Sequence, residues 1–167
     1  MKHQYPIVND DDQIIGYKEK NQAYKEGLML RAIQIFVYNE DGELFIQKRS
    51  KNKLRYPNCF CSSVAGHVEP GESYQKAAIR ELEEELGIKN HNNLKFIIKE
   101  KSPIDKQNHS ITSFFTIKTS DKIKLQEEEI ENGNFYKVDD IKELISLQNN
   151  FTPGFLYFFN KIHGTFV

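Results

Sequence analysis

The sequence predicts an α/β domain, in which strands and helices alternate along the chain. Stretches rich in β-branched and aromatic residues, most clearly 28–38 and 111–118, have the composition of buried strands. An uninterrupted run of helix formers, 74–86, lies between them. No repeat, low-complexity tract or interdomain linker divides these segments, and 167 residues is the size of one ordinary domain. We therefore expect a single domain over residues 1–167.

The composition restricts where the protein acts and on what. The 23 basic and 24 acidic residues give a net charge of −1, so no overall field attracts a nucleic acid polymer or an anionic membrane. No apolar run approaches the ~18 residues of a membrane span, and no signal-type segment follows the first residues. We expect a cytoplasmic protein that binds neither a nucleic acid polymer nor a membrane. Cys59 and Cys61 have no second Cys/His pair nearby and are expected to be reduced thiols.

The N-terminal third is predicted to form a hairpin, a short helix and a long strand. Residues 6–18 alternate as a hairpin, with a polar turn at 9–12. The three aspartates in that turn lack the spaced ligands of an EF-hand loop, so we expect a turn without calcium. A short helix over 20–26 ends at Gly27, and a strand follows over 28–38. An Asp-Gly turn then leads into a returning strand at 43–47.

Five cations follow that returning strand within eight positions: Lys48, Arg49, Lys51, Lys53 and Arg55. Because they leave a strand just before an acidic stretch, we expect some of them to face phosphate. Arg49 is the favoured contact, since a guanidinium grips phosphate bidentately, and Lys48 is predicted beside it. Lys51 and Lys53 are expected to be solvated.

The middle of the chain predicts a strand over 61–66 and then a capped helix. A Pro-Gly turn at 70–71 precedes Ser73, a candidate N-cap, and Gly87 stands where a left-handed C-cap belongs. At 100° per residue one helix face is apolar and should pack on a core. That face consists of Ala78, Ile79, Leu82 and Leu86.

Three carboxylates, Glu81, Glu84 and Glu85, occupy an arc beside the apolar face. They repel one another unless a cation lies among them, and ligands that are all oxygen suit Mg²⁺ or Mn²⁺. The alternative is a solvated acidic face on which Arg80 offsets Glu84 at i, i+4.

The C-terminal half predicts two strands, a third strand and two helices. Strands at 94–101 and 111–118 flank a polar linker, 102–110, that is suited to shaping a substrate pocket with Tyr56 and Phe60. A strand at 133–138 follows. Asp139 or Asp140 is predicted to cap a helix that runs through Leu147, and Thr152-Pro153 to begin the final helix.

Residues 66–88 resemble the Nudix box at each of its specified positions. The pattern is Gly66, five residues, Glu72, seven residues, then Arg80-Glu81-Leu82-x-Glu84-Glu85-x-Gly87-Ile88. Nine fixed positions over 23 residues make a specific motif. The resemblance implies the Nudix fold, an α/β/α sandwich with a mixed curved sheet. It also implies divalent-metal-dependent hydrolysis of a nucleoside diphosphate linked to another moiety, by water attack on phosphorus.

The resemblance also implies roles for residues of the box. Glu81, Glu84 and Glu85 match metal-binding and base positions, with Glu81 or Glu85 the residue that activates water. Gly66 matches a glycine whose carbonyl binds metal, and Glu72 and Arg80 match a structural pair.

Many Nudix proteins add a metal-binding acid from outside the box. Glu129 is the predicted residue for that role, with Glu127 and Glu128 as alternatives. A homodimer is possible.

A second resemblance is to isopentenyl-diphosphate isomerases, a branch of the same superfamily. It rests on residues 47–50, Tyr56-Pro57-x-Cys59-Phe60 and residues 63–67. The isomerase cysteine position is Ala65 here, and of the isomerase metal histidines only His67 matches. We therefore expect a hydrolase, with His67 solvated or structural. A non-catalytic nucleotide sensor is the third alternative, although sensors commonly lose the box acids that this chain retains.

Overall fold

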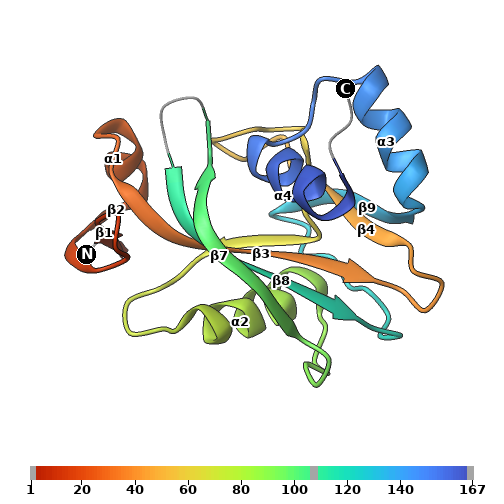
Figure 1. Ribbon diagram of the computed structural model, residues 1–167, viewed down its shortest axis with the longest axis horizontal. Coiled ribbons are helices and arrows are strands. Elements are labelled where there is room, and N and C mark those ends of the chain that lie inside the picture. Colours follow the sequence, from red (N-terminus) through yellow and green to blue (C-terminus); the bar gives the residue numbers. More distant parts are fainter. Residues whose placement is uncertain (1–2, 106–108, 165–167) are drawn as a thin grey trace.

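A mixed sheet with helices on both faces forms the body of the protein (Figure 1). The computed structural model describes residues 3–105 and 109–164, and within them this is the α/β sandwich that the sequence predicts. In chain order the elements are β1 (Gln4–Val8), β2 (Ile14–Glu19), α1 (Lys20–Lys25), β3 (Met29–Tyr38), β4 (Leu44–Arg49), β5 (Phe60–Cys61), β6 (Val64–His67), α2 (Tyr74–Leu86), β7 (Lys95–Pro103), β8 (His109–Lys118), β9 (Ile130–Tyr136), α3 (Val138–Leu147) and α4 (Pro153–His163).

Strand β3 is the centre of the sheet. It pairs in parallel with β8 and antiparallel with β1 and β6, and it meets β4 at its C-terminal end. Helices cover both of its faces, so apolar side chains alternate on both sides of the strand. Ile33 and Ile35 face the cluster beneath α2, whereas Phe36 faces the aromatic cluster of α4.

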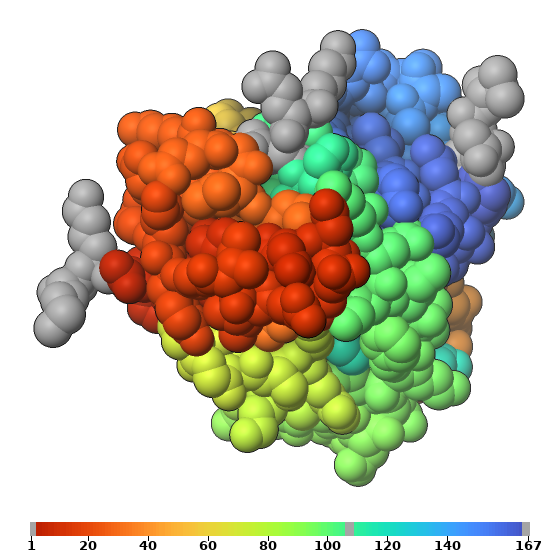
Figure 2. All heavy atoms as spheres, turned by 60° about the vertical axis from the view of Figure 1, so that its left-hand side comes forward, coloured from red at the N-terminus to blue at the C-terminus, as the bar shows by residue number. Residues whose placement is uncertain are grey.

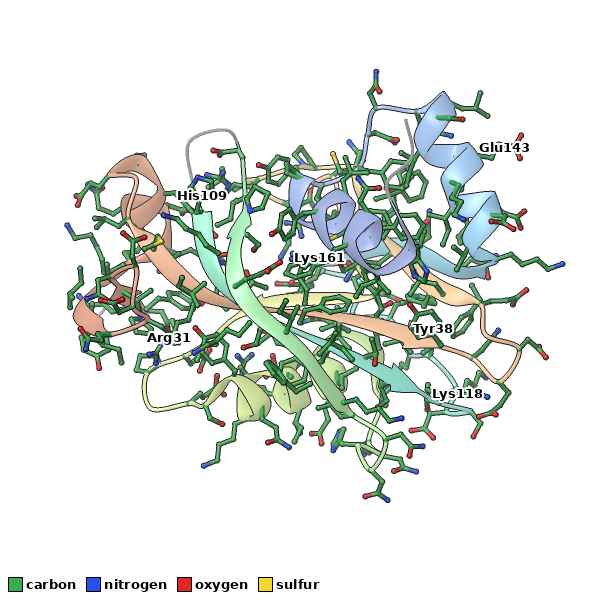
Figure 3. All side chains as sticks on the ribbon, viewed as in Figure 1. Arg31, Tyr38, His109, Lys118, Glu143 and Lys161 are labelled. Carbon is green, nitrogen blue, oxygen red and sulfur yellow. The ribbon has the colours of Figure 1, made fainter. Side chains whose placement is uncertain are left out.

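The two helical layers pack differently. Helix α2 buries Ala77, Ala78, Leu82 and Leu86 against one face of the sheet. Helix α4 buries phenylalanines on the opposite face, and the rings of Phe114 and Phe158 stack with their centroids 4.7 Å apart. Lys161 of α4, labelled in Figure 3, pairs with Glu100 of β7 at 2.7 Å. None of the helices in the described part of the chain has the length and apolarity that a membrane span requires.

The predicted N-terminal hairpin is present and is held by ion pairs. Strands β1 and β2 pair antiparallel, and Figure 2 shows them lying beside α2 and β7. Asp12 lies 2.7 Å from Arg31 Nε and 2.7 Å from Lys99 Nζ, and it accepts a hydrogen bond from the Tyr74 hydroxyl at 2.9 Å. The side chain of Arg31 is labelled in Figure 3. The three-aspartate segment is therefore a turn, and cationic side chains balance its charge.

Some predicted boundaries are wrong. The strand expected at 61–66 is divided into β5, which pairs with β4, and β6, which pairs with β3. Between them the Ser63 hydroxyl donates to the carbonyl of Phe45 and accepts from the Val37 amide. Strands β7 and β8 extend into the expected linker, of which residues 106–108 lie outside the described residues. Helix α3 has Lys137 as its N-cap, so Asp139 and Asp140 lie in the first turn instead of capping it.

Candidate active site

The caps of α2 are those predicted from the sequence. The Ser73 hydroxyl accepts from the Lys76 amide at 3.2 Å, and Gly87 ends the helix in the left-handed region at φ +67°. Glycine adopts that backbone conformation without the steric cost that a Cβ brings. With the apolar face of α2 on the core, Glu85 is 3% exposed, whereas the Glu84 side chain is 53% exposed.

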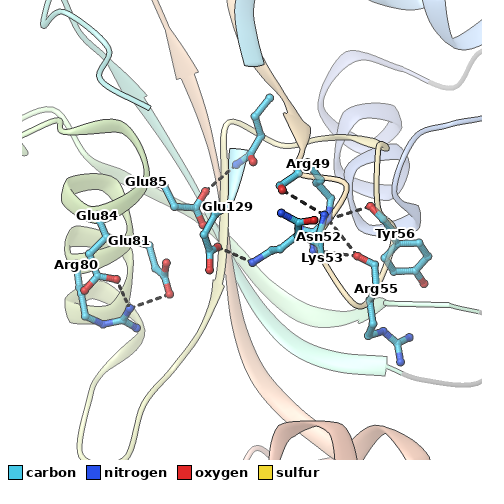
Figure 4. A network of polar contacts seen from close by, with 12 residues as sticks. Arg49, Asn52, Lys53, Arg55, Tyr56, Arg80, Glu81, Glu84, Glu85 and Glu129 are labelled. Atoms are coloured by element: carbon cyan, nitrogen blue, oxygen red, sulfur yellow. Dashed lines mark hydrogen bonds and ion pairs between the residues drawn. The ribbon is translucent and has the colours of Figure 1, made fainter. Parts of the chain in front are cut away.

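Arg80 joins the loop before α2 to the acids on the helix. Its guanidinium contacts both carboxylate oxygens of Glu72, at 2.8 and 3.1 Å, and donates to the carbonyl of His67 at 3.0 Å. Its Nη1 also contacts Glu81 at 2.8 Å and Glu84 at 3.1 Å (Figure 4). The i, i+4 pairing considered as the alternative for Glu84 is therefore present in the structure.

Gly66 is needed because the Glu81 carboxylate packs directly against its backbone. A Cβ added at Gly66 would lie 2.1 Å from Glu81 Oε1, well inside any allowed contact. Any side chain at this position would displace that carboxylate from the β6 backbone.

Glu85 is a buried carboxylate that Gln47 holds. The Gln47 amide donates to Glu85 at 2.7 Å and to the carbonyl of Ser63 at 3.0 Å. Burial, and then the negative charge of Glu81, raise the pKa of Glu85 well above its ordinary value. Burial also raises the pKa of Glu81, and the charge of Glu84 adds to this, in spite of the adjacent Arg80.

Glu129 approaches this acidic group from the turn before β9. Its carboxylate lies 2.7 Å from Lys53 Nζ, and its charge contributes to the raised pKa values of both Glu81 and Glu85. Glu127 and Glu128 are exposed on the same turn. Of the three acids considered outside the box, Glu129 is therefore the one whose side chain faces the site (Figure 4).

These acids suit a hard divalent cation in donor type and in charge. All their donors are oxygen, and the buried carboxylates raise one another's pKa, which an added cation would reverse. Across residues 3–105 and 109–164, no three His, Cys, Asp or Glu side chains form a ready ligand cluster. Instead Arg80 and Lys53 supply the positive charge, through Glu81, Glu84 and Glu129.

A cavity of about 190 Å³ lies beside Gly66 and His67, and residues of α1, β3 and the start of α4 contribute to its lining. Four cationic side chains line it: Lys20, Arg49, Lys53 and Arg55. Lys20 has no carboxylate partner among the described residues. Burial, and then the charge of Lys53, lower its pKa. An anion entering this cavity would meet positive charge that protein carboxylates only partly neutralise.

The cations of the cavity differ from those predicted. Lys53, expected in solvent, lines the cavity, and Lys20 had no sequence signal because it lies far from the box. Lys48 pairs with Glu131 at 3.3 Å, and the Phe60 ring packs on Phe151 at 5.2 Å. Neither Lys48 nor Phe60 belongs to the described lining, so the prediction that they contact substrate has no support in this geometry.

Arg49, the favoured phosphate contact, lines the cavity but also braces the loop that follows it. Its guanidinium donates to the carbonyls of Arg55 and Tyr56 at 3.1–3.3 Å. Tyr56 has a φ of +50°, which is rare for a large side chain, and these hydrogen bonds hold that conformation. Arg49 therefore positions Arg55 and Tyr56, which also line the cavity.

His67 is hydrogen-bonded within the cavity wall. Its Nε2 lies 2.5 Å from the Tyr24 hydroxyl, and the Tyr5 ring meets it edge-on. Burial, and then the charge of Lys20, lower the pKa of His67 to about 3, so the imidazole is neutral. This agrees with the structural alternative for His67.

The comparisons with known proteins agree on one family. The NUDIX domain family matches residues 29–155. An uncharacterized Nudix hydrolase from Nostoc sp. is 45% identical over 83 residues, so the match spans about half of each chain, 49% of this one and 49% of that one. Isopentenyl-diphosphate Delta-isomerase 1 of Photorhabdus laumondii is 31% identical over 155 residues, which cover 89% of this chain and 88% of the isomerase.

Solved structures share the fold at low sequence identity. A Deinococcus radiodurans protein superposes with a TM-score of 0.82 at 22% identity, covering 95% of this chain and 98% of that one. The NUDIX domain of Shewanella oneidensis NrtR, crystallised with ADP ribose, superposes with a TM-score of 0.64 at 12% identity, covering 87% of this chain and 97% of that one. Both likenesses bear on the fold alone.

Proposed function

The chain belongs to the Nudix family, and from that premise we propose that it hydrolyses a pyrophosphate linkage in a nucleoside diphosphate derivative, using Mg²⁺ or Mn²⁺. One observation carries the proposal: Lys53, a cation of the cavity lining, contacts Glu129 at 2.7 Å, and the charge of Glu129 acts on Glu81 and Glu85 of α2. Such a site can hold a divalent cation and a diphosphate next to each other.

The proposed metal ligands are the carboxylates Glu81, Glu84, Glu85 and Glu129, with the backbone carbonyl of Gly66. A bound divalent ion neutralises charge on the phosphoryl oxygens. Lys20, Lys53 and Arg55 would bind the diphosphate from the other side. Arg49 would keep in place the loop that carries Lys53 and Arg55.

We assign the removal of a proton from the attacking water to Glu85. Arg80 holds Glu81 Oε1 at 2.8 Å, which makes Glu81 a weaker base, whereas among the described residues only the Gln47 amide donates a hydrogen bond to Glu85. A positioned general base contributes on the order of 10²–10⁴-fold to rate.

Isomerisation of isopentenyl diphosphate is a second candidate, favoured by the isomerase relative that aligns with most of the chain. Two features oppose it. Ala65 has no thiol at the position that resembles the isomerase cysteine, and the Nε2 of His67 is already bonded to Tyr24.

The test is a product-resolved assay with Mg²⁺ or Mn²⁺ on ADP-ribose, nucleotide sugars, dinucleoside polyphosphates and isopentenyl diphosphate. We expect hydrolysis of a nucleotide substrate and a fall of about 10²–10⁴-fold in kcat for Glu85→Gln. Glu83→Gln is the matched control, because Glu83 lies on the far side of α2 and pairs with His91 at 3.3 Å. Nucleotide binding without turnover would indicate a sensor instead, and an allylic isomer product would indicate an isomerase.

A further inference from the structure

An amide side chain projects into the cavity at a point that the proposed chemistry does not use. Gln34 lies on β3 directly opposite Ala65 of β6, and both side chains line the cavity. Ala32, two residues earlier on the same face of β3, lines it as well. Gln34 is thus a polar group set between two alanines.

One end of this amide has a partner, and the other faces the cavity lining. The Ser62 hydroxyl donates to Gln34 Oε1 at 2.6 Å, which orients the amide. Gln34 Nε2 has no hydrogen-bond acceptor among the residues that the structure describes. It packs against Gly154, the second residue of α4, where an added Cβ would lie 2.3 Å from Nε2. Gly154 therefore leaves the space that the amide occupies.

An unpaired N–H₂ group in a cavity selects what can be bound there. A ligand group with an acceptor forms a hydrogen bond with the N–H₂ group. A hydrocarbon displaces the water that solvates the N–H₂ group and supplies no acceptor in its place. The cations of the cavity provide for the diphosphate. Beside Gln34, a ring that carries nitrogen or carbonyl acceptors is favoured over an isoprenoid chain, because it can accept the hydrogen bond.

We propose that Gln34 is a specificity-determining residue, whose amide donates a hydrogen bond to the nucleobase of a nucleoside diphosphate and disfavours hydrocarbon diphosphates. This inference rests on the proposed function, since it concerns the group attached to the diphosphate that is cleaved. Gln34 lies outside the Nudix box, on a strand whose residue pattern predicts only a buried strand. Its side chain would distinguish nucleotide substrates from isopentenyl diphosphate.

The test measures binding, so that it does not depend on turnover. Dissociation constants for ADP, CDP, GDP, UDP and isopentenyl diphosphate are determined with Mg²⁺ by calorimetry, in the full chain carrying Glu85→Gln. Gln34→Met, which keeps the length of the side chain but removes its donor, is then added. We expect the preference for the tightest-binding nucleotide over isopentenyl diphosphate to fall about tenfold. Gln148→Met is the matched control, because Gln148 is exposed at the end of α3.

A fall of fivefold or more in that preference supports the inference, and a smaller fall overturns it. A parent chain that binds isopentenyl diphosphate more tightly than every nucleotide overturns it too. Gln34→Glu, which keeps the shape but not the N–H₂ donor, decides the question by the same criterion if Gln34→Met does not fold. Failure of the proposed function is distinct, since it would show as nucleotide selectivity in binding without hydrolysis by the unmodified chain.

Discussion

The acidic and basic walls of the site are built differently. Three acids of the acidic wall lie within five consecutive positions of α2, and one more is added from the turn before β9. The basic wall combines Lys20 of α1 with Arg49, Lys53 and Arg55, which lie at and after the end of β4. One wall is therefore mostly a local property of a helix, whereas the other exists only when separate segments meet.

The two walls also have opposite electrostatic imbalances. Burial and neighbouring negative charge raise the pKa values of Glu81 and Glu85. Burial and neighbouring positive charge lower the pKa of Lys20. Each wall is thus short of counter-ions and is suited to a ligand of opposite charge, a metal ion on one side and phosphates on the other.

Of the substitutions that test the contrast between the two walls, Gly66→Ala is expected to have the largest effect, because it disturbs the acidic wall. In Gly66→Ala the new Cβ must displace the Glu81 carboxylate, which lies 2.1 Å from its position. A displacement of about 1 Å in an active site can cost on the order of 10²-fold, so we expect kcat to fall about that much. Steady-state kinetics and thermal unfolding are measured together.

Gly16→Ala is the control, because nothing lies within 4 Å of its Cβ position. A folded Gly66→Ala protein that keeps its kcat within about threefold of the parent would show that the acidic wall does not depend on this contact.

A smaller effect is expected from the basic wall. Lys20→Met removes a half-buried cation that has no carboxylate partner in the described chain, so no protein group loses an ion pair. We expect KM for a diphosphate substrate to rise about tenfold with kcat nearly unchanged, as for one lost charge-assisted hydrogen bond. Lys25→Met, at the exposed end of the same helix, should leave KM unaltered. Equal KM values for the two variants would remove Lys20 from the basic wall.

The smallest effect concerns a carboxylate outside both walls, whose charge is already balanced. Burial would raise the pKa of Asp12, but hydrogen bonds from Lys99, Arg31 and Tyr74 lower it below its ordinary value. We expect Asp12→Asn to reduce the free energy of unfolding by about 1–2 kcal/mol at pH 7 without changing KM.

The sign of the pH dependence follows from the lowered pKa of Asp12. Its contribution is complete above the unfolded pKa of about 3.9 and is lost as the pH falls through the lower folded value. Denaturant unfolding at several pH values should therefore show the gap between parent and Asp12→Asn closing only below about pH 4. A gap that closed near pH 6 would mean that another group controls it.

Local sequence determined the elements that carry their own signals. Ser73 and Gly87 cap α2 as predicted, and Thr152-Pro153 begins α4. The apolar stripe of α2 packs on the sheet through Ala78, Leu82 and Leu86, whereas Ile79 is only half-buried. These features depend on neighbours within one or two turns, so periodicity and capping chemistry suffice to predict them. The acidic arc of α2 was predictable for the same reason.

Tertiary structure decided which cations lie near the acids and which other residues line the cavity. Lys20, Lys53 and Gln34 reach the cavity because α1, the segment after β4, and β3 meet there, and Lys48 and Phe60 turn elsewhere. The residues next to these positions in the sequence carry no signal that predicts this arrangement. Contacts between residues distant along the chain depend on how the strands pair and the helices pack, and so only the folded sheet sets them.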